Sequence, residues 1–255
     1  MKMKKNDFNP NKCALASLWP DFVKMDKRSR YELPFVLKML DSRNGIEVLD
    51  AGAGIGATVI PLNRSGRVGQ LVINEVDTHF RDLVKKKLRH FGVRGAMTRV
   101  DWRSENILKL GAFDAILCLG NSLTYLFDKE DQMKALRHFR QMLKEGGQLL
   151  IDERNYEHLF LRGDGENYRW SGNYVYCGKG KVDARPVHIE ENLVVMRYRH
   201  RKSGLSGDLK LYPFKEGELH ALLLESGFSS VRVFGDYKEN FAPDKPEFLT
   251  YVCSN

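Results

Sequence analysis

A chain of 255 residues with 42% hydrophobic residues can form one α/β domain with a full core, and no apolar run approaches the roughly 20 residues that cross a bilayer. The four cysteines form no C-x-x-C pair and the seven histidines no H-E-x-x-H pattern, so we expect reduced thiols, a cytoplasmic location and no metal site. The basic N-terminus lacks an apolar segment behind it, which argues against a secretory signal.

Helices and strands alternate over the first part of the chain, which predicts a mostly parallel sheet with right-handed crossovers. The strand expected at Phe113–Leu119 is nearly continuous in apolar residues, as a strand buried on both faces should be. In chain order we expect a helix Tyr31–Leu40, a strand Glu47–Asp50, a helix after a glycine loop, a strand Leu71–Asn74, a helix Arg81–Arg94, strands Ala96–Val100 and Phe113–Leu119, a helix Lys129–Leu143, a stop at Gly146–Gly147 and a strand Gln148–Ile151.

The pattern changes after the fifth strand. Residues 155–214 lack a helical period, Leu193–His200 alternates on a period of two, and Ser203–Asp208 has turn chemistry before a strand Leu209–Tyr212. A helix Glu216–Glu225 and strands Val231–Phe234 and Phe248–Val252 close the chain. We expect one domain over residues 1–255, in which an antiparallel insertion of about three strands over residues 155–214 caps the active site.

The segment Val48–Gly56 joins an apolar strand, which ends in Asp50, to a loop with three glycines at alternate positions. Glycine has no Cβ and tolerates positive φ, so such a loop lets the backbone approach a ligand closely. A second strand about twenty residues on is followed by Glu75, and an acid there accepts hydrogen bonds from ribose hydroxyls. The G-x-G-x-G spacing resembles motif I of class I S-adenosylmethionine-dependent methyltransferases more than a nicotinamide-binding loop.

Ligands of open α/β sheets bind beyond the carboxyl ends of the strands. Five segments are expected at those ends and define one cleft: Asp50–Gly56, Glu75, Asp101–Trp102, Leu119–Asn121 and Asp152–Arg154. Trp102 can cover one face of an adenine, and Asp101 can accept from the adenine amino group. We favour this ligand role over a rim tryptophan that only packs on a neighbouring helix.

The net charge of +8 raises the question of nucleic-acid binding. The densest basic cluster runs from Arg81 to Arg94, on a segment whose apolar residues recur on one face. We interpret it as the solvated side of a surface helix, because no aromatic residues are interleaved for base stacking. His79 and His138 lie in helical patterns and are also expected at the solvated surface.

Several longer segments resemble the glycine N-methyltransferase / glycine-sarcosine methyltransferase family. The segments that carry the resemblance are Asp26–Arg30 (D-x-R-S-R), Phe113–Ser122 (ending in L-G-N-S), Ile151–Tyr156 (containing D-x-R-N-Y), Leu211–Pro213 (Y-P) and Phe234–Lys238 (G-D-[FY]-K). The matches run from Asp26 to Tyr251. They imply a Rossmann-like class I methyltransferase fold with a mostly parallel seven-stranded sheet and a small antiparallel insertion after the fifth strand.

Carried over by position, the resemblance implies S-adenosyl-L-methionine as the cofactor and a small-molecule amine as the acceptor. Arg30 would bind the carboxylate of the methionine moiety, Glu75 the ribose hydroxyls, and Asp101 and Trp102 the adenine. The other implied cofactor-binding residues are Asp50, Ala51, Gly52, Gly54 and Leu119. Asn121 and Arg154 would bind the acceptor carboxylate, and Tyr176 and Tyr212 would close the methyl-transfer pocket.

The chain departs from the family in places. Tyr125 stands where a histidine is common, and the segment Gly163–Pro186 aligns poorly. A salt bridge to Asp152 or Glu153 is the structural alternative for Arg154, and we favour the ligand role. Ordinary sheet packing explains Tyr176 and Tyr212 as well as a role in the pocket does.

Together these features predict an N-methyltransferase that acts on glycine or sarcosine. A methyltransferase for another small amine, such as an amino sugar or a natural product, is one alternative. An RNA methyltransferase and a non-catalytic cofactor-binding subunit are others. We expect no nucleic-acid partner and no membrane association, and a homo-oligomer stays open.

Overall fold

A computed structural model describes residues 12–40, 43–162 and 180–255 of the chain. Seven strands form one sheet in the order β3-β2-β1-β4-β5-β10-β9, in which β10 runs antiparallel to both neighbours and the other pairings are parallel. The strands are β1 Ile46–Asp50, β2 Val68–Asn74, β3 Ala96–Thr98, β4 Phe113–Cys118, β5 Leu143–Arg154, β9 Ser230–Gly235 and β10 Phe248–Ser254. This confirms the fold class expected from the sequence.

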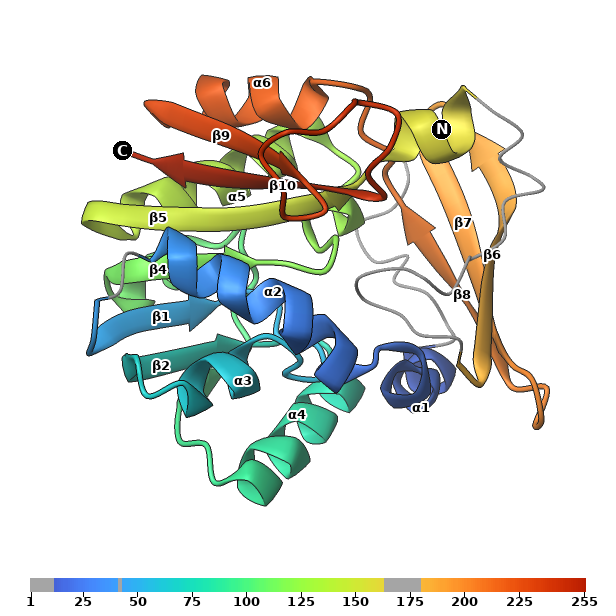
Figure 1. The fold of residues 1–255 in the computed structure, drawn as a ribbon, viewed down its shortest axis with the longest axis horizontal. Coiled ribbons are helices and arrows are strands. Elements are labelled where there is room, and N and C mark those ends of the chain that lie inside the picture. Colours follow the sequence, from blue (N-terminus) through green and yellow to red (C-terminus); the bar gives the residue numbers. More distant parts are fainter. Residues whose placement is uncertain (1–11, 41–42, 163–179) are drawn as a thin grey trace.

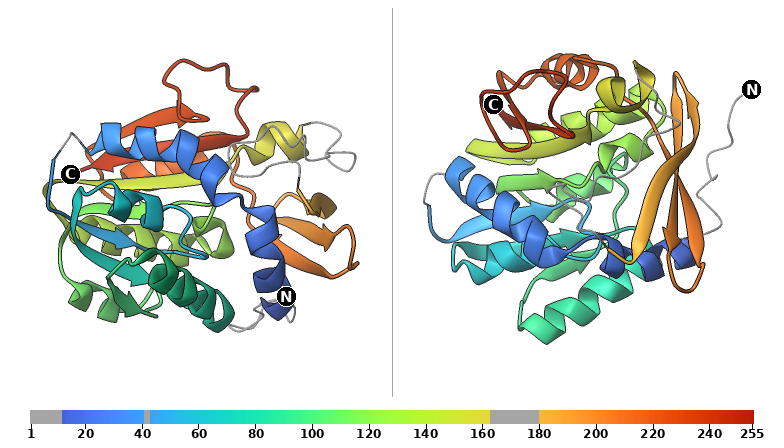
Figure 2. Two further views of the ribbon diagram at one scale, coloured as in Figure 1. Left: turned by 60° about the horizontal axis from the view of Figure 1, so that its bottom comes forward. Right: turned by 45° about the vertical axis from the view of Figure 1, so that its right-hand side comes forward.

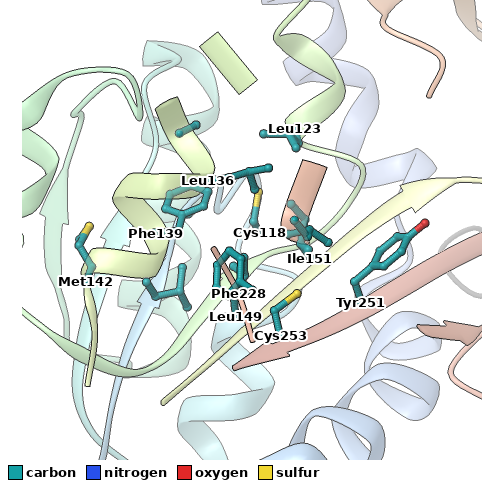
Figure 3. Close-up of a cluster of buried hydrophobic side chains, with 14 of the residues drawn as sticks. Cys118, Leu123, Leu136, Phe139, Met142, Leu149, Ile151, Phe228, Tyr251 and Cys253 are labelled. Atoms are coloured by element: carbon teal, nitrogen blue, oxygen red, sulfur yellow. The ribbon is translucent and has the colours of Figure 1, made fainter. Parts of the chain in front are cut away.

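Helices cover both faces of this sheet, because successive side chains of a strand point to opposite faces. In β1, Val48 packs with α2, α3 and α4, whereas Leu49 packs with η1, α5 and α6. Figure 3 shows the second core, where Phe139 and Leu136 of α5 meet Leu149 of β5. The helices are α2 Met25–Met39, α3 Val59–Arg64, α4 Thr78–Phe91, η1 Glu105–Leu110, α5 Lys129–Gln141 and α6 Glu218–Glu225.

The helices that follow β2 and β4 begin at side-chain caps. The Asp77 carboxylate accepts from the backbone N–H groups of the first turn of α4, and Asp128 does the same for α5. Gly92 ends α4 in the left-handed conformation with φ of 66°. Helix α5 begins at Lys129 as predicted, whereas Asp77 and Gly92 place α4 at Thr78–Phe91 and not at the predicted Arg81–Arg94.

A second, smaller sheet lies between β5 and α6 in the chain and is antiparallel throughout. Its strands are β6 Val182–Glu190, β7 Leu193–His200 and β8 Ser206–Leu211. Figures 1 and 2 show it to one side of the main sheet, with helix α1 (Lys12–Phe22) beside it. A third core joins α1, the small sheet and the glycine loop through residues such as Leu15, Phe22, Tyr198 and Ile55.

The structure corrects several sequence expectations. Helix α1 was not expected, because Pro20 lies inside it. Gly146–Gly147 lies within β5, where the pairing with β4 shifts register, and does not end α5. A short π-helix η3, Glu157–Leu161, follows β5 where no helix was expected. Within the described ranges, no helix is both long and apolar enough to cross a membrane.

Candidate functional site

A cavity opens at the carboxyl ends of the parallel strands, where the strand order reverses between β1 and β4. Six of the expected cofactor-binding residues line it: Ala51, Gly52, Gly54, Glu75, Trp102 and Leu119. Other lining residues come from elements outside this unit, among them Leu15 and Trp19 of α1 and Leu209 of β8. These three were missed because their elements are remote in sequence from the glycine loop, and no motif marks them.

The glycine loop is tied to the tip of β2 through Glu75. One carboxylate oxygen accepts from the Gly54 N–H at 2.8 Å and the other from the Asp77 N–H at 2.9 Å. Gly54 has a φ of +53°, and an added Cβ would meet no protein atom within 4 Å. The backbone at Gly54 therefore needs glycine for its conformation and borders open space, as a loop that approaches a ligand should.

Two buried carboxylates face this loop. Burial raises the pKa of Glu75 to about 7, although the backbone N–H groups of Asp77 and Gly54 oppose the shift. Burial also raises the pKa of Asp50 to about 7, against the nearby charge of Arg28. Glu75 lines the cavity, whereas Asp50 lies behind the loop and accepts from the Gly52 N–H. The structure thus places Asp50 in support of the loop.

Trp102 is locked against the loop, because its indole Nε1–H donates to the Ala51 carbonyl at 2.7 Å. Asn74, which sequence reasoning missed, is fully buried and donates to the carbonyls of Ala51 and Val100 at 3.2 and 2.9 Å. An Asn amide can satisfy groups on three strand tips at once, and this one holds β1, β2 and the turn after β3 together. The position of Trp102 is thereby set by backbone groups.

His138 supports the same turn, since its Nδ1 lies 2.7 Å from the Trp102 carbonyl oxygen. Its side chain is buried, so the expectation of a solvated His138 was wrong, whereas His79 is exposed as expected. The helical period of α5 placed His138 correctly on the helix. The pattern gave no signal that the turn after β3 would cover this face.

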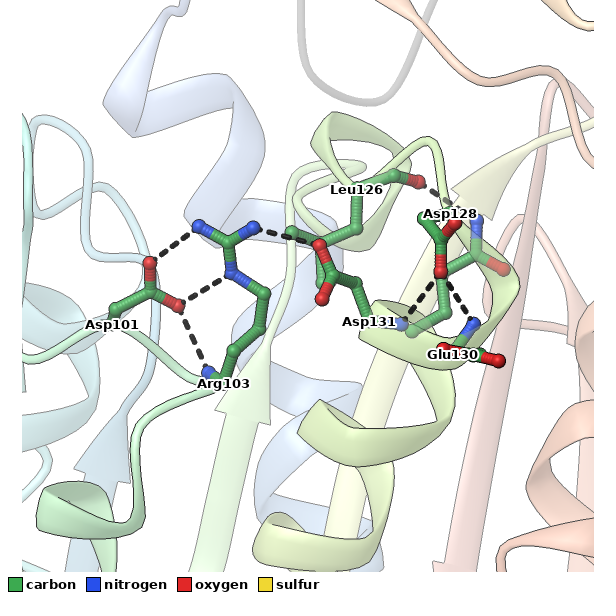
Figure 4. A network of polar contacts seen from close by, with 7 residues as sticks. Asp101, Arg103, Leu126, Asp128, Glu130 and Asp131 are labelled. Carbon is green, nitrogen blue, oxygen red and sulfur yellow. Dashed lines mark hydrogen bonds and ion pairs between the residues drawn. The ribbon is translucent and has the colours of Figure 1, made fainter. Parts of the chain in front are cut away.

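Asp101 lies next to Trp102 but does not line the cavity. Its carboxylate binds Arg103 at 2.6 Å, and Arg103 also reaches Asp131 of α5 at 2.7 Å, as Figure 4 shows. The hydrogen bond from Arg103 lowers the pKa of Asp101, so this acid stays ionised. The expected contact with the adenine amino group would compete with this ion pair.

Two arginines of α2 differ in position. Arg30, expected to bind the methionine carboxylate, is exposed and does not line the cavity. Arg28, two residues earlier, is buried and does line it, and its guanidinium donates to Glu32 at 2.8 Å and to Thr58 at 2.7 Å. Residues two apart on a helix point in different directions, so Arg28 lines the cavity and Arg30 does not.

The residues expected at the acceptor end meet in a buried polar network between the tips of β4 and β5. The Asn121 backbone N–H donates to Asp152 at 2.6 Å, and its side-chain N–H donates to the Tyr156 hydroxyl at 2.6 Å. The Asn121 amide oxygen accepts from the Arg154 backbone N–H at 2.9 Å. Asn121 itself has a φ of 66°, so these contacts hold a strained turn in place.

The buried guanidinium of Arg154 lies over two aromatic rings, 5.9 Å from the centroid of Phe160 and 5.4 Å from that of Phe248. Tyr212 turns elsewhere, because its hydroxyl donates to Glu218 at 2.6 Å. Asn121, Arg154 and Tyr212 do not line the cavity as the described residues form it. Tyr176 lies outside the described residues.

The fold and the cavity define a methyltransferase domain. Residues 48–147 match the family model described as "Methyltransferase domain". Among solved structures, an S-adenosylmethionine-dependent methyltransferase from Clostridium acetobutylicum superposes with a TM-score of 0.73 at 18% identity, covering 94% of this chain and 97% of its own. The CcbJ methyltransferase from Streptomyces caelestis also gives a TM-score of 0.73, at 16% identity, covering 94% of this chain and 95% of its own.

Relatives that match this chain over most of their length identify its family among the methyltransferases. The glycine/sarcosine N-methyltransferase of Halorhodospira halochloris is 31% identical over 238 residues, which cover 92% of this chain and 85% of the relative. The enzyme of the same name from Aphanothece halophytica is 32% identical and covers 92% of this chain and 86% of the relative. The chain belongs to the glycine/sarcosine N-methyltransferase family, which confirms the resemblance found in the sequence.

Proposed function

We propose that this protein transfers the methyl group of S-adenosylmethionine to the amine nitrogen of glycine or sarcosine. The observation that carries the proposal is the presence of two sites at the carboxyl ends of parallel strands in the same sheet. One is the cavity along the glycine loop and Glu75, and the other is the buried Arg154 at the tip of β5. A guanidinium in low dielectric is the preferred partner for a small carboxylate, because it donates two parallel hydrogen bonds.

The residues present fit the cofactor. The open space at Gly54 admits a ligand against the backbone, Glu75 offers further lone pairs to ribose hydroxyls, and the indole of Trp102 offers a flat face. Arg28 supplies a positive charge in the cavity wall for a carboxylate. When bound, S-adenosylmethionine supplies a methyl group on a positively charged sulfur, which is already a good leaving group.

Because the leaving group is good, the protein mainly aligns the nucleophile and excludes water. Arg154 binds the carboxylate of the acceptor and so orients the acceptor. The network of Asn121, Asp152 and Tyr156 holds the tip of β5 that carries Arg154. Helix α1 and the small sheet cover the cavity and limit the access of water. The amine must reach the site uncharged, since its lone pair forms the new bond.

An acceptor screen that measures S-adenosylhomocysteine release tests the proposal. Glycine and sarcosine should be methylated, whereas glycine methyl ester should be a poor acceptor because Arg154 then has no carboxylate to bind. Amino sugars serve as the control for another small amine, and RNA at low and high salt as the control for a nucleic-acid substrate. Equal turnover of glycine and its ester, or turnover of RNA alone, would contradict the proposal.

A further inference from the structure

Tyr125 connects the two ends of the site. It lies at the end of η2 (Leu123–Tyr125), immediately after the turn that follows β4, and it lines the cavity together with Glu75. Burial raises the pKa of Tyr125 well above its ordinary value, as do the neighbouring groups of Tyr198, Tyr156 and Glu75, and the charge of Arg154 opposes them. The phenol thus shares the cavity wall with Glu75 at the cofactor end and experiences the charge of Arg154 at the acceptor end.

The turn that carries Tyr125 is rigid. Thr124 donates to the Asn121 carbonyl at 2.7 Å, and the Thr124 carbonyl accepts from the Tyr212 backbone N–H at 2.8 Å. The Tyr125 N–H donates to the Ser122 carbonyl at 3.3 Å. A side chain on a turn fixed by its neighbours is preorganised, which is what a group aimed at a reacting atom requires.

The hydroxyl of Tyr125 can form a further hydrogen bond with a ligand. Within the described part of the chain, no residue hydrogen-bonds to it, whereas the hydroxyls of Tyr156 and Tyr212 are each engaged with a side chain. The high pKa keeps the phenol protonated at neutral pH, so it does not serve as the base that removes a proton from the amine. Its oxygen can still accept a hydrogen bond.

We propose that the Tyr125 hydroxyl accepts a hydrogen bond from the acceptor nitrogen during methyl transfer, so that it selects amines that still carry an N–H. This inference rests on the proposed function. The amine lone pair forms the N–C bond, the electron pair of the broken C–S bond stays on sulfur, and the proton of the new ammonium leaves to solvent. Positive charge develops on nitrogen in this step, so the hydrogen bond strengthens in the transition state.

The choice among acceptors depends on how many N–H groups the attacking neutral amine carries. Glycine presents two N–H groups and sarcosine one, whereas dimethylglycine has none and cannot make this contact. A phenol at this position therefore favours the first two methylations over the third. The chain carries tyrosine where a histidine is common in the family, and a neutral imidazole nitrogen can also accept a hydrogen bond.

Steady-state kinetics of Tyr125→Phe with glycine, sarcosine and dimethylglycine test the inference. Tyr125→Phe should lower kcat on glycine and sarcosine roughly 10- to 100-fold while the cofactor Kd stays within twofold by calorimetry. Tyr125→His should recover most of the lost activity, because the ring nitrogen accepts again. Tyr31→Phe is the matched control, since this tyrosine is 51% exposed on α2 and should leave all constants unchanged.

A Tyr125→Phe enzyme with wild-type kcat would overturn the inference while the proposed function stands. A loss of cofactor affinity in place of kcat would also overturn it, because the hydroxyl would then serve the cofactor. If the wild type methylates neither glycine nor sarcosine, the proposed function itself fails, and this inference fails with it.

Discussion

The two ends of the proposed site, the cofactor end and the acceptor end, are built in different ways. At the cofactor end, the contacts run largely through the backbone: the Gly54 N–H donates to Glu75, and the Ala51 carbonyl accepts from Trp102. At the acceptor end, the hydrogen bonds run through side chains: the amide of Asn121 links the Tyr156 hydroxyl to the backbone N–H of Arg154.

This difference determines what a mutation can reveal. A site that relies on backbone contacts is most sensitive to the loss of a glycine, whereas a side-chain network fails when one polar group loses its geometry. It also separates the roles, since the cofactor end can be common to many methyltransferases and the acceptor end can differ among them. Three experiments test how far the two ends are independent, and a fourth tests the buried carboxylate at the cofactor end.

The largest effect is expected for Gly54→Val. A β-branched residue is strained at a φ of +53°, and its side chain would fill the space beside the loop, so we expect cofactor affinity to fall on the order of 100-fold or more. Gly92→Val is the matched control, because Gly92 has a φ of +66° and open space at the end of α4. If calorimetry finds the same cofactor Kd for both variants, the glycine loop is not part of the cofactor site.

Arg154→Lys should affect the acceptor end alone. An ammonium cannot reproduce the bidentate contact, so kcat/KM for glycine should fall on the order of 100-fold while the cofactor Kd is unchanged. Arg140→Lys serves as the control, since Arg140 lies on α5 against Gly227 and does not line the cavity. A fall in cofactor affinity of the same size would show that the two ends are coupled through β5.

Arg28→Gln and Arg30→Gln distinguish the two arginines of α2. Because Arg28 lines the cavity and Arg30 is exposed, we expect cofactor affinity to fall roughly 10-fold for Arg28→Gln and less than about twofold for Arg30→Gln. Thermal unfolding separates lost binding from lost stability, since Arg28 also donates to Glu32 and Thr58. The opposite order of affinities would restore the role first expected for Arg30.

Glu75→Gln should change how stability depends on pH. The pKa of Glu75 is raised to about 7 from 4.5, so the protonated form is favoured on folding. Its contribution to stability is present below pH 4.5 and is lost as the pH rises to about 7. Between pH 5 and pH 8 the wild type should therefore lose roughly 2–3 kcal/mol more free energy of unfolding than Glu75→Gln. Urea titrations at both pH values measure this, and parallel profiles would contradict a raised pKa.

The sequence was sufficient to predict the main sheet and most of the residues that line the cavity at the glycine loop. Apolar runs and helical periods located the strands and helices, because those patterns are set by which faces are buried. The loop Gly52–Gly56 and Glu75 could be predicted to lie together because the glycines and the acid belong to one local strand–loop–helix–strand unit. The residues proposed to bind the acceptor were predicted from a family resemblance, since no local pattern marks a buried arginine as a ligand.

Only the tertiary structure decided which of two neighbouring side chains faces the cavity. Helix phase and strand pleat set direction, and a shift of one or two residues turns a side chain away, as with Arg28 and Arg30 or Asp101 and Trp102. The structure also brought α1 and β8 over the cavity through a third core of residues such as Leu15 and Tyr198. Such long-range packing depends on shape complementarity between distant segments, and no local spacing in the chain encodes it.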